Sequence, residues 1–223
     1  MYDRLKGLFT EDNISKLNSI NVLLVGVGGV GATCLEVLVR TGIKNITIVD
    51  YDTYEESNLN RQLHSNNLNI GSKKIEVLKK EMEAINPNIE VNAIDTFIDD
   101  KTNLNLRKFD YIIDACDSIK AKIYLITKAN ELGIKEISAL GAGNRLDPSL
   151  MEITTLNKTT NDPLAKKLRY ELKKINYNEK VMVASSKEIP IKSNPVSSYM
   201  PVASYSGMLL ADYIIKDVIN GSK

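Results

Sequence analysis

The sequence is poor in the residues that build disulfides and metal sites. Its 223 residues include two cysteines, Cys34 and Cys116, and one histidine, His64. The cysteines form no C-x-x-C pair, so the sequence predicts neither a disulfide framework nor a zinc site held by cysteine. Cys116 beside Asp117 is a candidate nucleophile, although a small buried residue at a strand end is the better interpretation. His64 suits a structural hydrogen bond as well as a functional role.

The sequence also lacks a strong net charge and a long apolar run. The formal net charge is +1, so nucleic acid could be attracted only by a local patch. Residues 1–13 lack the apolar core of a signal peptide. The most apolar late stretch, residues 200–219, is interrupted by Asp212, Lys216 and Asp217, which favours an amphipathic helix over a membrane span. We therefore expect a cytoplasmic protein without a membrane span.

A glycine-rich turn lies between an apolar strand and a helix. Residues 22–25 form an apolar run that leads into G-x-G-x-x-G, with Gly26, Gly28, Gly29 and Gly31. Glycines in this pattern allow a tight turn, a close approach to phosphate and close helix packing. A second apolar strand, residues 46–49, ends in Asp50, which is placed to bind a ribose hydroxyl. This unit predicts a nucleotide site but does not distinguish a dinucleotide from ATP.

Strands and helices alternate along the rest of the first two thirds of the chain. Apolar patterns predict strands at residues 89–94, 109–114 and 137–140, helices at 71–86 and 118–132, and a helical arm at 3–18 that carries Arg4. This alternation predicts an α/β fold with a doubly wound, mainly parallel Rossmann-like sheet. The polar connection of residues 51–69 is long enough to suggest a functional loop.

The pattern changes after residue 144. We expect residues 1–144 to form the nucleotide-binding region with its helical arm. Residues 145–223 are expected to be a C-terminal mixed α/β extension for substrate binding and dimerisation, packed with the first region as one domain. The extension should contain strands at 151–155 and 181–184, a loop at 185–198 and a closing strand-helix segment at 199–218.

A basic helix is predicted at residues 162–175. Its charged side chains are Lys166, Lys167, Arg169, Lys173 and Lys174. Such a face is usually only solvated, but three further lysines, Lys180, Lys187 and Lys192, extend the positive charge beyond the helix. If the protein binds a polyanion, this is the predicted surface.

The carboxyl ends of the predicted strands should gather a group of charged residues. Ligands of open α/β sheets bind at this edge. The group comprises Asp50, Asp52, Asn58, Arg61, Asp114 and Asp117, facing the glycine loop. Carboxylates near a phosphate site require cations, and Mg²⁺ is the natural one. Arg61 and Lys74 would stabilise charge on a phosphoryl group, unless Arg61 merely pairs with a surface glutamate, Glu55 or Glu56.

These motifs together resemble a known superfamily. GVGGVG, IVDYD, SNLNRQLH, GSKK and DACD are similar to the motifs of the ATP-dependent adenylyltransferases that include the ubiquitin-activating enzymes and bacterial sulfur-carrier activators. The resemblance implies a homodimer that adenylates a carboxylate. It implies that Asp50 binds the ribose, that Asn58, Arg61 and Lys74 bind the phosphates, and that Asp117 binds Mg²⁺. Arg4 lies near the position of an arginine that reaches into the partner subunit's site.

Later segments resemble one branch, the tRNA threonylcarbamoyladenosine dehydratases. They are RTGIKNIT, DSIKAK, GAGNRLDPS, NDPLAKKLRYELKK and SSKE. This resemblance implies ATP-dependent adenylation of the threonyl carboxylate at tRNA position 37, followed by intramolecular ring closure. It also implies that the basic helix binds tRNA. A monovalent cation near Gly141 and sulfur-transfer partner proteins are further candidates.

Two alternatives remain open from the sequence. One is an adenylyltransferase that activates the C-terminus of a ubiquitin-like sulfur carrier, although the zinc-binding cysteine pairs of many such enzymes are absent here. The other is an NAD-binding protein, which would leave Asp52, Arg61 and Lys74 without a shared purpose.

Overall fold

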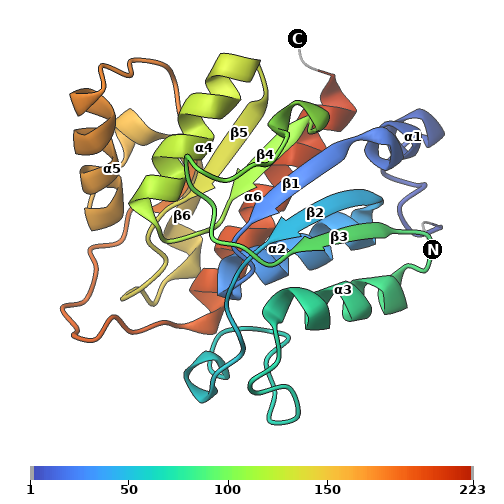
Figure 1. Cartoon of the computed structure of the whole chain (residues 1–223), viewed down its shortest axis with the longest axis horizontal. Helices are drawn as coiled ribbons and strands as arrows, with labels where there is room; N and C mark the ends of the chain where they lie inside the picture. Colours follow the sequence, from blue (N-terminus) through green and yellow to red (C-terminus); the bar gives the residue numbers. More distant parts are fainter. Residues whose placement is uncertain (1–2, 222–223) are drawn as a thin grey trace.

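The centre of the molecule is a seven-stranded sheet (Figure 1). The computed structural model describes residues 3–221. The strands are β1 (Asn21–Val25), β2 (Asn45–Val49), β3 (Glu90–Ile94), β4 (Tyr111–Asp114), β5 (Lys135–Ala139), β6 (Met151–Thr155) and β7 (Met182–Ser186). Their order is β3-β2-β1-β4-β5-β7-β6, and only β6 runs antiparallel to its neighbour. The predicted mainly parallel, doubly wound sheet is confirmed.

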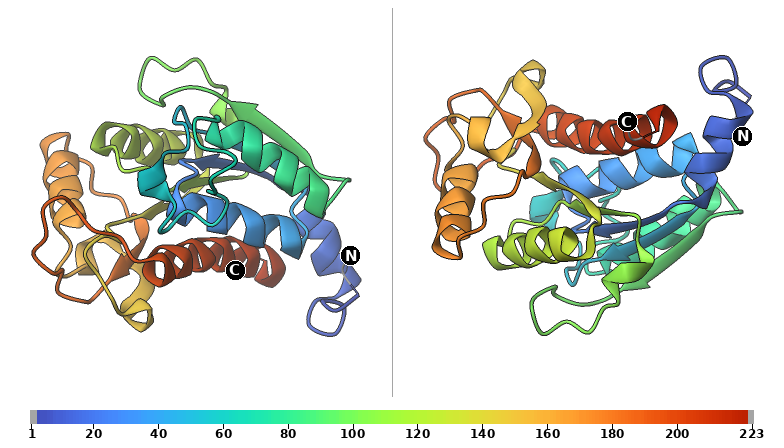
Figure 2. Two further views of the ribbon diagram at one scale, coloured as in Figure 1. Left: turned by 90° about the horizontal axis from the view of Figure 1, so that it is seen from below. Right: turned by 90° about the horizontal axis from the view of Figure 1, so that it is seen from above.

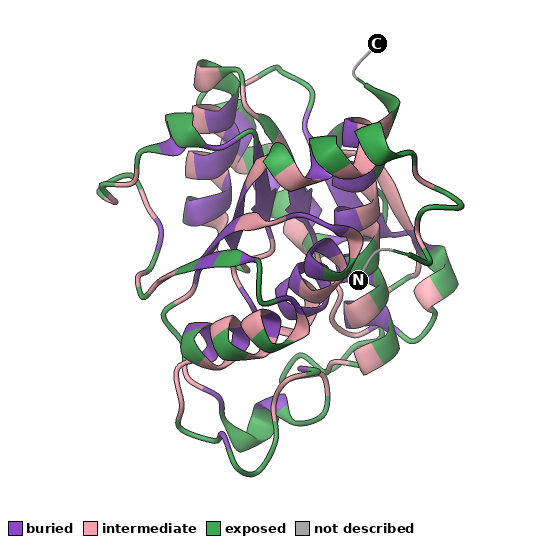
Figure 3. Ribbon diagram, turned by 90° about the vertical axis from the view of Figure 1, so that its right-hand side faces the viewer, coloured by how far each residue is buried: buried purple, intermediate pink, exposed green. Residues whose placement is uncertain are grey.

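Helices cover both faces of the sheet (Figure 2). The helices α1 (Glu11–Ser19), α2 (Gly29–Thr41), α3 (Lys74–Ile85) and α6 (Met200–Asn220) share one apolar cluster with the sheet. On the opposite face lies α4 (Ile119–Leu132), and α5 (Pro163–Lys174) packs against α4. The helices α2 and α6 pack closely at Gly207, where a Cβ would overlap the Val30 carbonyl. The absence of a side chain at Gly207 therefore permits this close approach. Buried residues line the sheet-facing sides of the helices (Figure 3).

The structure differs from the predicted elements most clearly at three places. Residues 3–9 form turns rather than a helix, and α1 begins only after Thr10, whose Oγ1 accepts a hydrogen bond from the Asn13 amide at 3.2 Å. Helix α3 begins at Lys74 because Gly71 has a left-handed φ of +85°, which ends any earlier helical turn. The closing segment contains no strand. Tyr199 is extended, but it is the single N-cap residue of α6.

The C-terminal extension continues the same sheet. Strand β7 pairs with β5 and β6 pairs with β7. Within residues 3–221, no helix combines the length and apolarity needed to cross a membrane.

The strand order creates a crevice near the middle of the sheet. From β1 the chain proceeds to β2 and β3 on one side, and then returns to β4 and β5 on the other. Connections therefore leave β1 and β4 in opposite directions at their carboxyl ends. Open α/β sheets bind ligands at such a switch point.

Candidate active site

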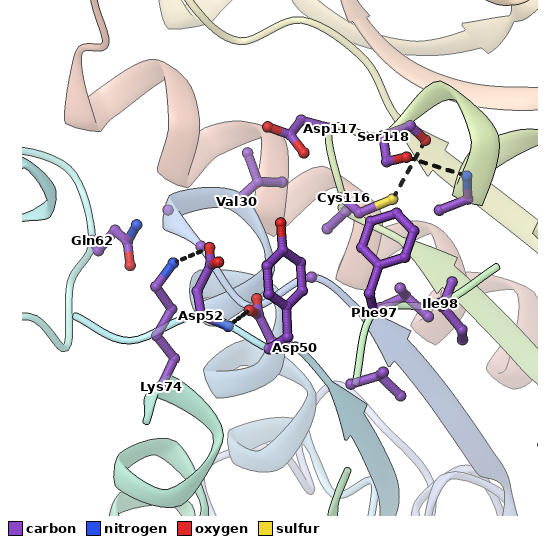
Figure 4. A pocket seen from close by; sticks show the side chains of 18 of the residues that line it. Val30, Asp50, Asp52, Gln62, Lys74, Phe97, Ile98, Cys116, Asp117 and Ser118 are labelled. Carbon is purple, nitrogen blue, oxygen red and sulfur yellow. Dashed lines mark hydrogen bonds and ion pairs between the residues drawn. The ribbon is translucent and has the colours of Figure 1, made fainter. Parts of the chain in front are cut away.

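A cavity of about 340 Å³ occupies this switch point (Figure 4). It is lined by the glycine loop after β1, residues 50–52 after β2, residues 96–98 after β3 and residues 115–118 after β4. Asn58, Arg61, Gln62 and Lys74 complete the wall. The structure thus brings together most of the nucleotide-site and Mg²⁺-site residues that the sequence predicts. The exceptions are Arg4, the deeply packed Gly31, and Asp114, which is fully buried and does not line the cavity.

The glycines have separate geometric roles. Gly26 has φ +85°, and a Cβ there would lie 2.7 Å from the Cys116 amide nitrogen. A Cβ at Gly31 would overlap the Gly26 carbonyl, so this position sets the distance between α2 and β1. At Gly29 the nearest atom would be the Arg61 carbonyl oxygen at 2.8 Å. At Gly28 the nearest atom would be Gln62 Nε2 at 3.8 Å, an ordinary van der Waals contact, and α2 begins beyond it without a side-chain cap. The first helical amides are therefore available to an anion.

Asp50 fixes the glycine loop. Its Oδ2 accepts a hydrogen bond from the Val27 amide at 2.8 Å, and its Oδ1 accepts one from the Asp52 amide at 2.8 Å. These two bonds hold the carboxylate beside the loop at the cavity wall. A carboxylate in this place can still accept from a ribose hydroxyl, because each oxygen has a second lone pair.

Lys74 forms a partly buried ion pair in the cavity wall. Its residue is only 4% exposed, and its Nζ lies 2.8 Å from Asp52 Oδ2. The Asp52 side chain is about half exposed. An ammonium has three donors, and among the described residues Asp52 engages one of them. Lys74 is therefore a desolvated cation that can also bind phosphate oxygens.

Asn58 and Arg61 lie in the loop between β2 and α3. Asn58 is buried, and its Oδ1 accepts from the Glu55 amide at 3.2 Å, which stabilises the turn. Arg61 Nη1 donates to the Ser57 carbonyl at 2.6 Å. Within residues 3–221, no ion pair joins Arg61 to Glu55, nor to Glu56. The alternative role of Arg61 as a partner of these glutamates is thus not observed.

Asp117 and Cys116 differ in their surroundings. Asp117 is exposed at the cavity and makes no hydrogen bond or ion pair with any described residue. Cys116 Sγ donates to Asp114 Oδ1 at 3.0 Å. Burial, with the neighbouring Asp114 carboxylate, raises the pKa of the Cys116 thiol well above its usual range. The thiol therefore stays protonated at neutral pH, which favours the structural interpretation of Cys116.

The residues at the cavity fit a magnesium ion shared with a nucleotide. Mg²⁺ is usually bound by one or two carboxylates together with substrate phosphates and water. Asp117 supplies an unpaired carboxylate opposite the glycine loop. Among the described residues, no group of three or more Asp, Glu, His or Cys side chains is placed to hold a metal ion. A metal at Asp117 would therefore depend on phosphate oxygens.

A buried network behind the cavity was not predicted. Lys122 is fully buried, and its Nζ donates to Asp114 Oδ2 at 3.1 Å, to Ser138 Oγ at 3.0 Å and to the Ala139 carbonyl at 2.7 Å. Burial lowers the pKa of Lys122, but Asp114, Cys116 and Glu136 together outweigh this effect and raise the pKa. The network joins α4 to the ends of β4 and β5. The signal in the sequence was a lysine on the apolar face of the helix predicted at residues 118–132.

An aromatic pair at the cavity rim was also missed. The rings of Tyr51 and Phe97 are 5.5 Å apart in an edge-to-face arrangement, and Ile98 beside them is buried. These apolar surfaces suit a flat base. Their position directly after β2 and shortly after β3 was the available signal.

His64 joins the loop to two helices. Its Nδ1 pairs with Glu81 of α3, and its Nε2 lies 3.4 Å from Glu36 Oε2 of α2. The His64 side chain is only 9% exposed. The structural interpretation of His64 is therefore supported, since carboxylates from two different helices face its ring.

Arg4 is not near the cavity of its own chain. It is exposed in the turns before α1, which leads into the amino end of β1, whereas the cavity lies at the carboxyl ends of the strands (Figure 1). Any role for Arg4 in catalysis would have to involve a neighbouring subunit.

The predicted basic helix is α5, and its side chains fall into two groups. Lys166, Lys167, Lys173 and Lys174 are exposed. Arg169 instead points inward, where its Nη1 donates to the Leu156 carbonyl at 2.9 Å and to Thr159. The exposed lysines remain available to a polyanion.

The later motifs of the sequence meet at Arg145. This side chain is 2% exposed, and it donates to the carbonyls of Gly141 and Asn161, both at 3.0 Å, and of Glu188. Asp162 caps α5 and lies 3.9 Å from the Arg145 guanidinium. GAGNRLDPS, NDP and SSKE are therefore neighbouring segments around one buried arginine.

The chain matches one protein family over almost its whole length. The family model described as the ThiF family matches residues 2–216. The tRNA threonylcarbamoyladenosine dehydratase of Haemophilus influenzae is 39% identical over 173 residues, which span 77% of this chain and 66% of that protein. The protein of the same name from Bacillus subtilis is 32% identical over 94% of this chain and 91% of its own length.

A solved structure is similar over nearly the whole chain. It is the tRNA N6-threonylcarbamoyladenosine dehydratase of E. coli, TcdA, in complex with ATP, which is 31% identical with a TM-score of 0.90. The match covers 98% of this chain and 95% of that one. Extensive identity and a family match over almost all of the sequence lead to one conclusion: the chain belongs to the ThiF family.

Proposed function

We propose that this protein is an ATP-dependent tRNA threonylcarbamoyladenosine dehydratase, which converts the modified adenosine at position 37 to its cyclic form. The observation that carries the proposal is the convergence of Arg61, Lys74 and Asp117 on the cavity at the glycine loop. Two cations and a free carboxylate around a phosphate site suit phosphoryl chemistry rather than hydride transfer. The relatives of that name, similar over up to 94% of this chain, support the choice of substrate.

Each cavity residue has a role in this reaction. The first amides of α2, beyond the uncapped Gly28, donate to the phosphates, and Asp50 accepts from the ribose. Lys74 and Arg61 stabilise the charge that develops on the α-phosphate and on the departing pyrophosphate. Tyr51 and Phe97 offer their rings to the adenine. Asp117 would hold Mg²⁺, which would supply further charge neutralisation on the phosphates.

The chemistry proceeds in two steps without a protein nucleophile. A carboxylate oxygen of the threonyl group bonds to the α-phosphorus of ATP while the bond to the bridging oxygen breaks, which releases pyrophosphate. The ureido group of the same side chain then attacks the acyl carbon, loses a proton and expels AMP. The net change is the loss of one water. Ring closure is intramolecular and therefore fast, so it needs no nucleophile from the protein. This agrees with Cys116, whose raised pKa keeps the thiol protonated and unreactive.

The partners follow from the surfaces. The exposed lysines of α5 bind the tRNA. A homodimer forms through exposed apolar side chains from three places: the loop between β2 and α3, the loop before α6, and the start of α6. They are Leu59, Leu63, Tyr199, Tyr205 and Met208. The two loops lie side by side, since Asn60 donates to the Ser198 carbonyl at 3.0 Å. The reaction takes place in the cytoplasm, where tRNA and ATP are present.

Mass spectrometry of tRNA nucleosides tests the function. Purified protein is incubated with ATP, Mg²⁺ and tRNA that carries threonylcarbamoyladenosine. We expect an ATP-dependent loss of one water from that nucleoside. An unchanged nucleoside, with ATP still bound, would refute the proposal. If a ubiquitin-like carrier protein then stimulated exchange between ATP and pyrophosphate, the carrier-activating alternative would replace it.

A further inference from the structure

The outer face of α5 is arranged around one aromatic side chain. Tyr170 is 61% exposed, more than any other aromatic residue in the described part of the chain. Residues three and four positions apart are neighbours on a helix. The four such neighbours of Tyr170, at positions −4, −3, +3 and +4, are Lys166, Lys167, Lys173 and Lys174. We call this group the Tyr170 face.

Most of the positive charge on the Tyr170 face is not neutralised. Lys174 lies over the ring, with its Nζ 4.3 Å from the centroid, and also pairs with Glu171 at 3.0 Å. The other three lysines are exposed, and their side chains make no hydrogen bond or ion pair with any residue between 3 and 221. Charged side chains alone are enough to solvate a helix surface, and they do not require an exposed aromatic ring. The exposed ring of Tyr170 is suited to contact a partner that has a flat apolar surface.

The combination of ring and lysines matches unpaired nucleotides. Base stacking on aromatic side chains and phosphate contacts with lysines are the two main components of single-strand binding. In a duplex the base faces are stacked on one another, and an acidic peptide would use the lysines but not the ring. We propose that the Tyr170 face binds a single-stranded loop of the RNA substrate, with Tyr170 stacked on an unpaired base. This inference rests on the proposed function, because that function supplies the RNA.

The position of α5 is compatible with this role. Asp162 caps the helix through the amides of Leu164 and Ala165, and its other oxygen accepts from the Gly141 amide at 3.1 Å. Gly141 follows β5 at the carboxyl edge of the sheet, which is also the edge of the nucleotide cavity (Figure 1). A flexible RNA loop can thus place one base on Tyr170 while another nucleotide enters the cavity. Lys174 covers one side of the ring, and the base stacks on the other.

Three variants separate stacking from charge. The ligand is an anticodon stem-loop RNA at fixed salt, and binding is measured by fluorescence anisotropy. Stacking contributes about 1–3 kcal/mol per base, so we expect Tyr170→Ala to weaken binding roughly tenfold and Tyr170→Phe to bind within about twofold of the natural protein. The salt dependence of Tyr170→Ala should match that of the natural protein, whereas Lys173→Gln should reduce the slope by about one ion.

A fluorescent base reports the stack directly. With 2-aminopurine in the RNA loop, we expect quenching by the natural protein and by Tyr170→Phe, and its loss in Tyr170→Ala. Equal affinity of Tyr170→Ala and the natural protein would overturn the inference, as would equally tight binding of a loop-free duplex. ATP affinity should be the same in all variants, which controls for folding.

The inference and the proposed function can fail separately. If the natural protein binds the stem-loop through Tyr170 but leaves the nucleoside unchanged, the function is wrong and the RNA surface stands. If water is lost from the nucleoside while Tyr170→Ala binds normally, the function stands and the inference is wrong. If the natural protein does not bind the RNA, the inference is also overturned.

Discussion

At the scale of single residues, the cavity contains one carboxylate that is not needed by the fold. Asp50 binds two backbone amides, Asp52 pairs with Lys74, and Asp114 belongs to a buried network. Asp117 alone among these is exposed and without a hydrogen bond or ion pair within the described residues. Its carboxylate is therefore available for chemistry.

The first prediction concerns Asp117→Asn. We expect the rate of ATP-dependent dehydration to fall on the order of 1,000-fold, because a metal clamp on phosphates contributes several kcal/mol. Thermal stability should stay within about 0.5 kcal/mol, as for other surface changes. The matched control is Asp100→Asn, another exposed aspartate that does not line the cavity. If Asp117→Asn unfolded the protein instead, Asp117 would be structural.

The second prediction concerns His64, which connects the loop carrying Asn58 and Arg61 to α2 and α3. Without the imidazole, Glu81 loses its ion-pair partner among the described residues and Glu36 keeps only Arg40. The loop is then no longer tied to the two helices and must be ordered when ATP binds. We expect His64→Ala to raise the KM for ATP about tenfold and to change kcat much less. Ordering the loop would cost about 1.4 kcal/mol, which weakens ATP binding tenfold but does not alter the chemical step.

Steady-state kinetics at several ATP concentrations measures this split. Asn67→Ala is the control, since Asn67 is an exposed polar residue of the same loop. If His64 serves only the stability of the fold, His64→Ala would lower the melting temperature and leave the KM of the folded enzyme for ATP unchanged.

At the scale of elements, Arg145 links three segments of the C-terminal extension. Its guanidinium donates to carbonyls after β5, before α5 and after β7. The third prediction is that Arg145→Met lowers the free energy of unfolding by about 3 kcal/mol, because it leaves three partly buried carbonyls without their donor and removes the cation beside the buried Asp162 carboxylate. Denaturant unfolding measures the change.

Hydrogen exchange shows where Arg145→Met acts. Protection should decrease in α5 and β7 and remain in β1 and β2, and ATP affinity should be retained. Arg107→Met, at an exposed arginine, is the control. Unchanged unfolding energy in Arg145→Met would mean that water replaces the guanidinium, contrary to its 2% exposure.

The predictability of the elements depended on how local their signals are. The apolar runs of β1, β2 and β4 predict a buried parallel sheet, because such strands are covered on both faces. The start of α3 was placed too early because the left-handed φ of Gly71 is not visible in the helical pattern. Arg145 was missed altogether, since its partners are backbone carbonyls from distant segments. Backbone groups leave no pattern in the sequence.

At the scale of the whole molecule, one predicted site residue lies far from the cavity. The superfamily resemblance assigns Arg4 a place in an active site, whereas the structure places it at the opposite end of the sheet from its own cavity. A homodimer reconciles the two, because a symmetric interface can bring each arm to the partner's cavity. The paired loops near α6 present the apolar side chains that such an interface would bury.

The fourth prediction tests this arrangement by mixing two inactive variants. Arg4→Ala keeps an intact cavity but lacks the arginine, and Asp117→Asn keeps the arginine but lacks the carboxylate. If Arg4 acts in the partner's site, a heterodimer of the two has one complete site. Random reassembly makes half of the dimers heterodimers, so the mixture should regain about a quarter of the natural activity.

Co-expression of the two variants allows the subunits to assort, and the loss of water from the nucleoside measures the regained activity. A mixture of Asp117→Asn with Lys74→Met is the control, because both changes inactivate the cavity and every heterodimer then has two damaged sites. No regained activity in the Arg4 mixture, from dimers whose exchange is verified by mass, would place Arg4 outside catalysis. Regained activity would mean that the active unit of this protein is the dimer. Each complete site would then combine Asp117 of one subunit with Arg4 of its partner, which a monomer cannot do.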